Sequence, residues 1–219
     1  RRVRHGGFLR SLDLFDNAFF GVSPAEAAAM DPQQRLLLER GYEALHGAGL
    51  ARHELLGLST GVFLGASYSD FERLLHGKAP PSAYAATGGS LAVASGRLSY
   101  TLGLQGPAVS YDTACSAALT ASHAATSALR LGECESGLVA GVSLMLLPDV
   151  SHSFAVAGML SALGRSHTFD RRADGYARGE ACCAWLLQGG ATARRPVASA
   201  LGSCVRQDGK SASLTAPNG

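Results

Sequence analysis

Short apolar runs with β-strand signals alternate with helical segments along almost the whole of this 219-residue chain. The longest apolar run, 137–147, fits a buried strand and is too short to span a bilayer. Strands are expected at 62–66, 108–111, 138–147, 181–187 and 197–206, and helices at 24–30, 32–46, 69–76, 91–102, 115–131 and 151–157. This alternation limits the chain to a layered α/β fold, in which helices cover a sheet.

Capping signals mark the starts of two of these helices. The segment SPAE at 23–26 places a serine at the N-cap, proline at the first helical position and glutamate at the third. The segment DPQQ at 31–34 repeats this arrangement with aspartate and glutamine. We therefore expect a capping box at each start, and we expect Gly47 and Gly49 to end the second helix.

Composition and charge exclude several classes of protein. Hydrophobic residues make up 47% of the chain and charged residues 16%, which is too apolar for a disordered chain. The net charge of +2 gives no electrostatic basis for binding nucleic acid or an anionic membrane. Five cysteines form an odd set without a CxxC pair, which argues against a disulfide framework or a zinc site. We expect a reducing, cytoplasmic location.

The segment 106–121 has the clearest chemical signal. A strand is expected to lead through a tight turn into an alanine-rich helix that begins at Cys115. Free N–H groups and the positive end of the helix dipole favour a thiolate there, so the pKa of Cys115 is expected to be lowered. Such a thiolate suits nucleophilic acyl transfer. The same pattern also fits a buried cysteine that serves as a small hydrophobic residue.

The histidines give no clear partner for this thiol. His123 falls on the same expected helix, about 12 Å from Cys115 at 1.5 Å per residue, so a structural role is expected for it. His152 and His167 belong to later segments that tertiary folding could bring closer.

Two further patterns match known chemistry less well. GLSTG at 57–61 fits the G-x-S-x-G pattern of hydrolases, but the expected strand follows the serine instead of preceding it, so a loop entering a strand is expected. A second group interleaves acidic and basic residues, which fits either an acid/base or metal site or a salt-bridged loop. Its members are Asp170, Arg171, Arg172, Asp174, Arg178 and Glu180, and we favour the salt-bridged loop.

Eight runs in order resemble one known family, the ketosynthases of type I polyketide synthases within the β-ketoacyl synthase group. The runs are GGFL at 6–9, FDNAFFGVSP at 15–24, MDPQQRLLLE at 30–39, DTACS at 112–116, GMLS at 158–161, ADGY at 173–176 with RGE at 178–180, QDG at 207–209 and LTAPNG at 214–219.

This resemblance implies a thiolase-like fold, with layers in the order α-β-α-β-α, of which the chain holds approximately the first half. It implies that Cys115 accepts an acyl chain as a thioester from the phosphopantetheine arm of an acyl carrier protein. A malonyl-type extender is then decarboxylated and joined to that chain by Claisen condensation, which makes the enzyme an acyltransferase. The N–H of Cys115 helps to form the oxyanion hole. A homodimer is implied for the full-length domain, with no directly bound cofactor or metal, no nucleic acid and no membrane.

The family's two active-site histidines and its lysine follow the segment that ends this sequence, and none of the seven histidines here lies in such a motif. We therefore expect 1–219 to be a partial β-ketoacyl synthase domain, truncated at both ends, without decarboxylation activity of its own. Large apolar faces are expected to be left uncovered.

Three alternatives stay open at this point. They are a fatty-acid β-ketoacyl-carrier-protein synthase, a non-condensing ketosynthase-like partner subunit, and a cysteine hydrolase on another fold. The DPQQ run and Arg35 favour the polyketide type, and Cys115 argues against the partner subunit, since such homologues lack it. The segment at 162–164 is ALG where the family usually has PDG, so the sequence does not specify the details of the substrate pocket. Phe154 is either a pocket residue or a plain core residue.

Overall fold

A computed structural model describes residues 4–67, 69–75, 83–190 and 196–213 of the chain. A four-stranded mixed sheet in the order β2-β1-β3-β4 lies at its centre. The strands are β1 (Thr60–Gly65), β2 (Ala108–Tyr111), β3 (Ser136–Ser143) and β4 (Ala181–Gln188). The first three are parallel, and β4 runs antiparallel to β3.

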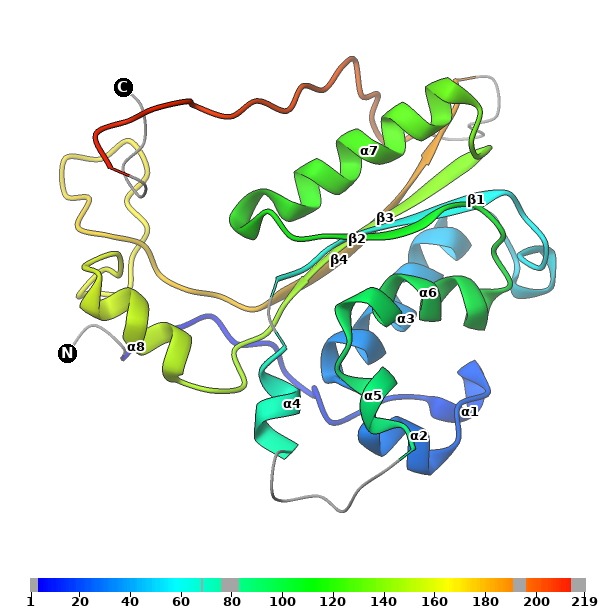
Figure 1. Cartoon of the computed structure of the whole chain (residues 1–219), viewed down its shortest axis with the longest axis horizontal. Helices are drawn as coiled ribbons and strands as arrows, with labels where there is room; N and C mark the ends of the chain where they lie inside the picture. The colour runs from blue at the N-terminus through cyan, green and yellow to red at the C-terminus, as the bar shows by residue number, and fades with distance from the viewer. Residues whose placement is uncertain (1–3, 68, 76–82, 191–195, 214–219) are drawn as a thin grey trace.

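Helices cover both faces of this sheet, which confirms the layered α/β expectation (Figure 1). One face carries α3 (Pro32–Gly47) and α6 (Leu91–Leu102), and the other carries α7 (Ala117–Leu131). Shorter helices lie outside these layers: α1 (Asn17–Phe20), α2 (Pro24–Ala29), α4 (Asp70–Leu75), α5 (Ala85–Gly88) and α8 (Asp149–Val156), with the 3-10 turns η1 (Arg52–Glu54) and η2 (Ala114–Ser116). Of these short elements, α1, α5 and η1 were not predicted from the sequence.

Each face of the sheet has its own apolar core. The larger core lies under α3 and α6 and includes the fully buried Leu37, Leu98 and Leu138. The smaller core lies under α7, where Ala121 and Ala125 pack near Phe63 and Val139 of the strands. Because these α7 side chains are small, the helix lies close to the sheet.

Both predicted helix starts form, but each predicted capping box is only half present. Ser23 Oγ accepts a hydrogen bond from the Glu26 N–H (3.2 Å), and Asp31 Oδ1 accepts one from the Gln33 N–H (2.8 Å). The Glu26 carboxylate instead pairs with the guanidinium of Arg97. The Gln34 side chain donates to the backbone of the α5 region and accepts from Arg97 Nε (2.6 Å). Tertiary partners have replaced the local ones.

The expected strand at 197–206 is wrong. This segment is exposed and has no strand partner among the described residues, and β4 pairs with β3 instead. A strand exists only where another strand satisfies its backbone groups, so an apolar pattern alone cannot establish one.

The strand expected at 138–147 ends at Ser143, because the backbone beyond it bonds to carboxylates. The Met145 N–H donates to Glu180 Oε1 (2.9 Å), and the Leu147 N–H donates to Asp70 Oδ2 (3.0 Å).

No helix among the described residues is long and apolar enough to cross a membrane.

Candidate active site

Cys115 lies in the turn between the carboxyl end of β2 and the start of α7. The sequence predicts that Cys115 begins the helix, but it belongs to η2, two residues before α7 begins. Ala114, directly before it, has a left-handed φ of 53°. That conformation costs an alanine about 1 kcal/mol, so the surrounding structure must hold it in place.

The close packing of α7 on the sheet sets the position of this turn. A Cβ placed on Gly65, the last residue of β1, would lie 2.3 Å from the backbone nitrogen of Ala118. A Cβ on Gly141 of β3 would lie 2.9 Å from the Cβ of Ala118. Glycine at these two positions lets the first turn of α7 rest directly on the strand ends.

Hydroxyl groups tie the turn to itself and to α7. Ser116 Oγ donates to the carbonyl oxygen of Thr113 (2.9 Å) and lies 2.9 Å from Thr113 Oγ1. Thr113 Oγ1 is also 3.1 Å from Thr120 Oγ1, one turn into the helix. Asp112 and Ser67 make further hydrogen bonds on the strand side. Sequence reasoning did not identify these hydrogen-bonding residues, and the signal for Asp112 was a polar residue two positions before Ala114.

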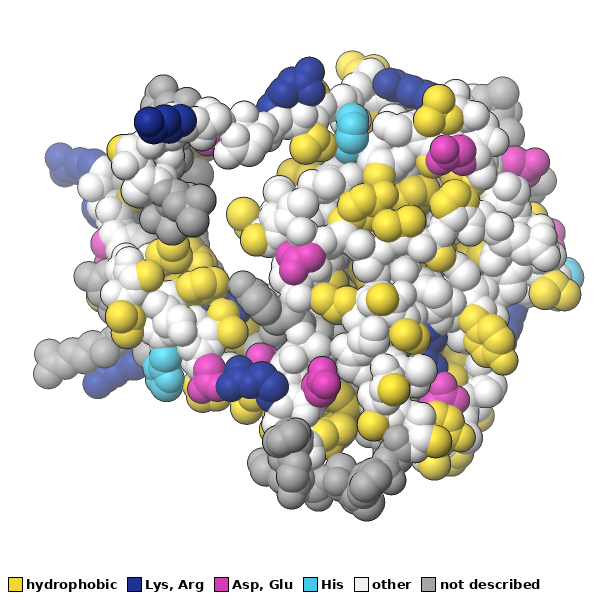
Figure 2. Space-filling model, in the orientation of Figure 1, with side chains coloured by type: hydrophobic (Ala, Val, Ile, Leu, Met, Phe, Trp, Pro, Cys, Tyr) yellow, Lys and Arg dark blue, Asp and Glu magenta, His cyan; other side chains and the backbone are white. Residues whose placement is uncertain are grey.

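The thiols differ sharply in environment. Cys115 is exposed, unlike a cysteine that fills a core, whereas Cys134 is buried. Burial raises the pKa of Cys134, and burial raises the pKa of Cys182 to about 12. Figure 2 shows open space beside the N-terminal end of α7, bounded on its far side by the loop after α8.

The predicted histidines are dispersed. His123 is half-buried on α7, and its Nδ1 lies 2.8 Å from Ser203 Oγ, so it has a structural contact. His152 lies exposed on α8. His167 Nδ1 is 4.0 Å from Asp170 Oδ2 in the loop beyond α8. No hydrogen bond or ion pair joins any of these three side chains to Cys115 within the described residues.

The GLSTG motif is a loop that enters a strand, as expected. Ser59 precedes β1, which begins at Thr60, and its carbonyl oxygen accepts a hydrogen bond from the Glu135 N–H (2.8 Å). No strand leads into this serine and no helix follows it, so the context of a nucleophilic serine is missing from this described segment.

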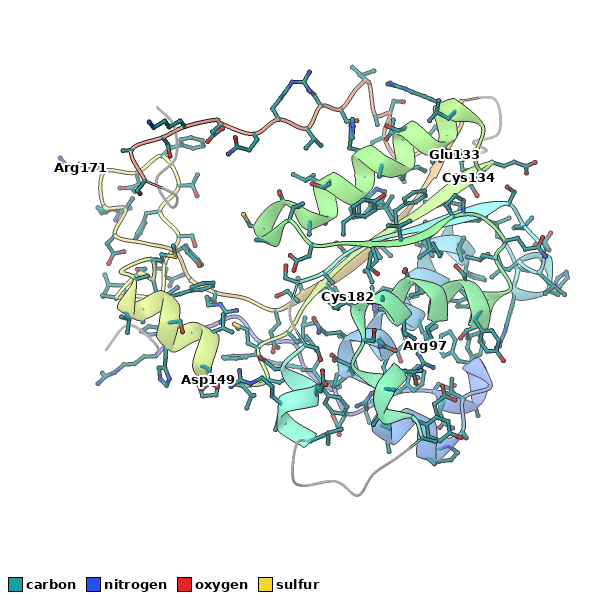
Figure 3. All side chains as sticks on the ribbon, viewed as in Figure 1. Arg97, Glu133, Cys134, Asp149, Arg171 and Cys182 are labelled. Carbon is teal, nitrogen blue, oxygen red and sulfur yellow. The ribbon has the colours of Figure 1, made fainter. Side chains whose placement is uncertain are left out.

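The mixed-charge group is a structural loop. Asp170 forms a bidentate pair with Arg172 at 2.6–3.1 Å, and this hydrogen-bonded pairing lowers the pKa of Asp170 to about 2. Arg171 extends away from the ribbon (Figure 3). No group of three or more potential metal ligands occurs in the part of the chain that the structure describes.

Other members of the mixed-charge group form hydrogen bonds with the N-terminal segment and with the loop after α8. Glu180 accepts hydrogen bonds from the N–H groups of Leu9 (2.8 Å) and Met145 (2.9 Å). Asp174 accepts one from the Ala162 N–H (3.1 Å). The guanidinium of Arg178 lies 5.2 Å from the centre of the Phe154 ring, so Phe154 packs against Arg178.

Comparisons with known proteins agree with this geometry. Residues 1–193 match the family model described as the N-terminal domain of β-ketoacyl synthase. The chain is 49% identical over 220 residues to the spectinabilin polyketide synthase system protein NorA' of Streptomyces orinoci. It is 48% identical over 222 residues to the polyketide synthase GfsE of Streptomyces halstedii. The two alignments cover 98% and 99% of this chain, which spans only 6% of the length of each relative.

Solved structures of ketosynthases are also similar to this chain. The ketosynthase from module 6 of the bacillaene synthase of Bacillus subtilis 168 is 37% identical, with a TM-score of 0.90 over 97% of this chain and 37% of that one. An oxazolomycin ketosynthase domain from Streptomyces albus is 36% identical, with a TM-score of 0.74 over 84% of this chain and 32% of that one.

Proposed function

The chain belongs to the β-ketoacyl synthase family and folds as the first half of its thiolase-like architecture, and from this premise we propose that it takes part in polyketide chain elongation. Residues 1–219 form the N-terminal portion of a ketosynthase domain, and the reaction is a decarboxylative Claisen condensation. The polyketide synthases among its relatives favour this product class over fatty acids.

Cys115 is the acyl acceptor in this proposal. Its thiolate attacks the carbonyl carbon of an acyl thioester on the phosphopantetheine of an acyl carrier protein. The tetrahedral oxyanion collapses, the carbon–sulfur bond to pantetheine breaks, the pantetheine leaves as a thiolate that takes a proton from water, and the acyl chain stays on Sγ. The observation that supports this role is the exposed thiol at the turn between β2 and α7, directly after the left-handed Ala114.

The carbon–carbon bond forms in a second step. Decarboxylation of a malonyl-type extender leaves a carbanion, which attacks the Cys115 thioester and releases the thiolate. We propose that the histidines and lysine for this step lie outside residues 1–219. The partners in this scheme are the acyl carrier protein and a second copy of the full-length domain, and a cytoplasmic location remains a prediction.

The test uses the complete ketosynthase domain that contains this chain. Incubation with an acyl N-acetylcysteamine thioester, a small analogue of acyl-phosphopantetheine, is expected to add one acyl mass to the protein. Cys115→Ala should abolish this addition in intact-protein mass spectrometry. Cys204→Ala, which removes another exposed thiol, should load like the parent.

Two outcomes would contradict the proposal. Acyl loading of Cys115→Ala at the parent rate would show that another group is the nucleophile. Rapid release of free acid from the loaded parent, without condensation when extender is supplied, would favour a cysteine hydrolase.

A further inference from the structure

One carboxylate oxygen accepts two hydrogen bonds beside the turn that presents Cys115. Asp112 Oδ1 accepts one hydrogen bond from the Ala114 backbone N–H (3.0 Å) and a second from Ser67 Oγ (2.8 Å). Ser67 follows β1 and Asp112 follows β2, and these two strands are parallel neighbours. The two hydrogen bonds therefore connect the ends of both strands to the residue directly before Cys115.

The sheet itself brings Ser67 and Asp112 together. The ladder of β1 and β2 pairs Gly65 with Tyr111, and the Ala66 N–H donates to the Tyr111 carbonyl oxygen (3.1 Å) just beyond it. One residue further along each chain, the side chains of Ser67 and Asp112 continue this contact. Asp112 thus has a fixed support on β1 and does not depend on its own turn alone.

The backbone that Asp112 holds is one that alanine rarely adopts. Ala114 has a φ of 53°, and its N–H is the group that Asp112 binds. Without that bond, Ala114 can relax to a negative φ, which would rotate the peptide group that leads into Cys115. Both the Sγ atom and the Cys115 N–H would then leave their positions.

We propose that Asp112 is a positioning residue for Cys115, with Ser67 as its support. This inference rests on the proposed role of Cys115 as acyl acceptor. Asp112 acts as a hydrogen-bond acceptor for two neutral donors, so its charge is not required. An asparagine side chain can place its carbonyl oxygen at the same point and accept both hydrogen bonds.

The experiment measures acyl loading in the complete ketosynthase domain as a function of thioester concentration. Asp112→Ala is expected to lower the maximal loading rate about tenfold or more, because a displaced nucleophile loses its attack geometry. The half-saturating thioester concentration and the circular dichroism spectrum should stay near those of the parent. Asp112→Asn should keep the rate within about threefold of the parent, because it keeps the acceptor oxygen.

Asp16→Ala is the matched control. Asp16 Oδ1 accepts a hydrogen bond from the backbone N–H of Phe19 (2.9 Å), a similar local arrangement at the start of α1, on the α3 side of the sheet. Its removal should leave loading unchanged. The double variant Ser67→Ala/Asp112→Ala should be no slower than Asp112→Ala, since Ser67 acts through Asp112.

The outcomes separate this inference from the proposed function. If Cys115→Ala still loads, the proposed function fails, whatever Asp112 does. If Cys115→Ala does not load but Asp112→Ala loads like the parent, only the positioning role is overturned. An Asp112→Asn variant as slow as Asp112→Ala would also overturn it. Should Asp112→Ala fail to fold, Ser67→Ala decides: a several-fold loss of rate supports the role, and an unchanged rate refutes it.

Discussion

At the scale of single residues, the cysteines of this chain differ mainly in their access to water. Cys115 is exposed in a turn at the end of β2. Cys182 lies on β4 on the side of the α3 core, where burial raises the pKa of its thiol to about 12. Cys134 is buried, and burial raises its pKa as well. Because only the thiolate is a good nucleophile, burial by itself keeps Cys182 and Cys134 unreactive.

This difference predicts the order in which the thiols react. In the folded complete domain at pH 8, iodoacetamide should modify Cys115 at least tenfold faster than Cys182. A thiol with a pKa near 12 is thiolate in only about one molecule in ten thousand at that pH. Peptide mass spectrometry after timed quenching measures both rates. In urea the two rates should converge, and equal rates in the folded protein would disprove the protection by burial.

At the scale of elements, the contact between α7 and the sheet determines where the turn that contains Cys115 lies. Gly65 and Gly141 leave no side chain between the strands and Ala118. The buried face of α7 continues this contact with Ala121 and Ala125, both fully buried. Small residues on both surfaces let the helix approach closely, so the turn before it is placed by the sheet and not by a loop.

Gly65→Ala tests this contact. The added Cβ would lie 2.3 Å from the Ala118 nitrogen, so α7 must shift, and we expect a loss of about 1–3 kcal/mol in the free energy of unfolding together with slower acyl loading. Gly96→Ala is the matched control, because Gly96 lies inside α6 and an added Cβ meets nothing within 4 Å. It should be neutral or stabilising by up to about 1 kcal/mol. Denaturant unfolding of the complete domain measures both, and equal stability of the two variants would contradict the close contact.

At the scale of the whole molecule, the two sides of the sheet are covered unequally. The α3 and α6 side encloses a large core, whereas α7 forms a single layer on the other side (Figure 1). Several large apolar side chains on and beyond this layer are exposed, among them Leu119 (73%), Val156 (90%), Leu163 (72%) and Leu201 (94%). Where exposed apolar side chains form a contiguous patch, the patch commonly marks a contact with another part of a protein.

Residues 1–219 produced alone should therefore expose apolar surface to solvent. We expect strong enhancement of 8-anilinonaphthalene-1-sulfonate fluorescence and self-association in size-exclusion chromatography. The complete ketosynthase domain should show weak enhancement and a single dimer peak. A monomeric 219-residue chain with no dye binding would contradict the expectation that these faces are covered in the full domain.

Local sequence signals were sufficient for the features that depend on neighbouring residues. The helix α6 begins and ends as predicted, α2 and α3 begin at their predicted proline starts, and strand β2 has its predicted bounds. The order of the eight motif runs identified the family, and the segment around Cys115 identified the candidate nucleophile. Capping, proline and glycine signals act within a few residues, so the chain alone contains them.

The contacts between residues far apart in the sequence were visible only in the tertiary structure. The sheet order, the loss of the expected strand at 197–206 and the partners of Glu26 and Gln34 all depend on segments far apart in the chain. The hydrogen bond from Ser67 to Asp112 joins residues 45 positions apart. Such contacts follow from how the strands align and how closely α7 approaches them, which no local pattern specifies. The sequence therefore singled out Cys115 as the candidate nucleophile, and the fold supplied the exposure of this residue and the hydrogen bonds of its turn.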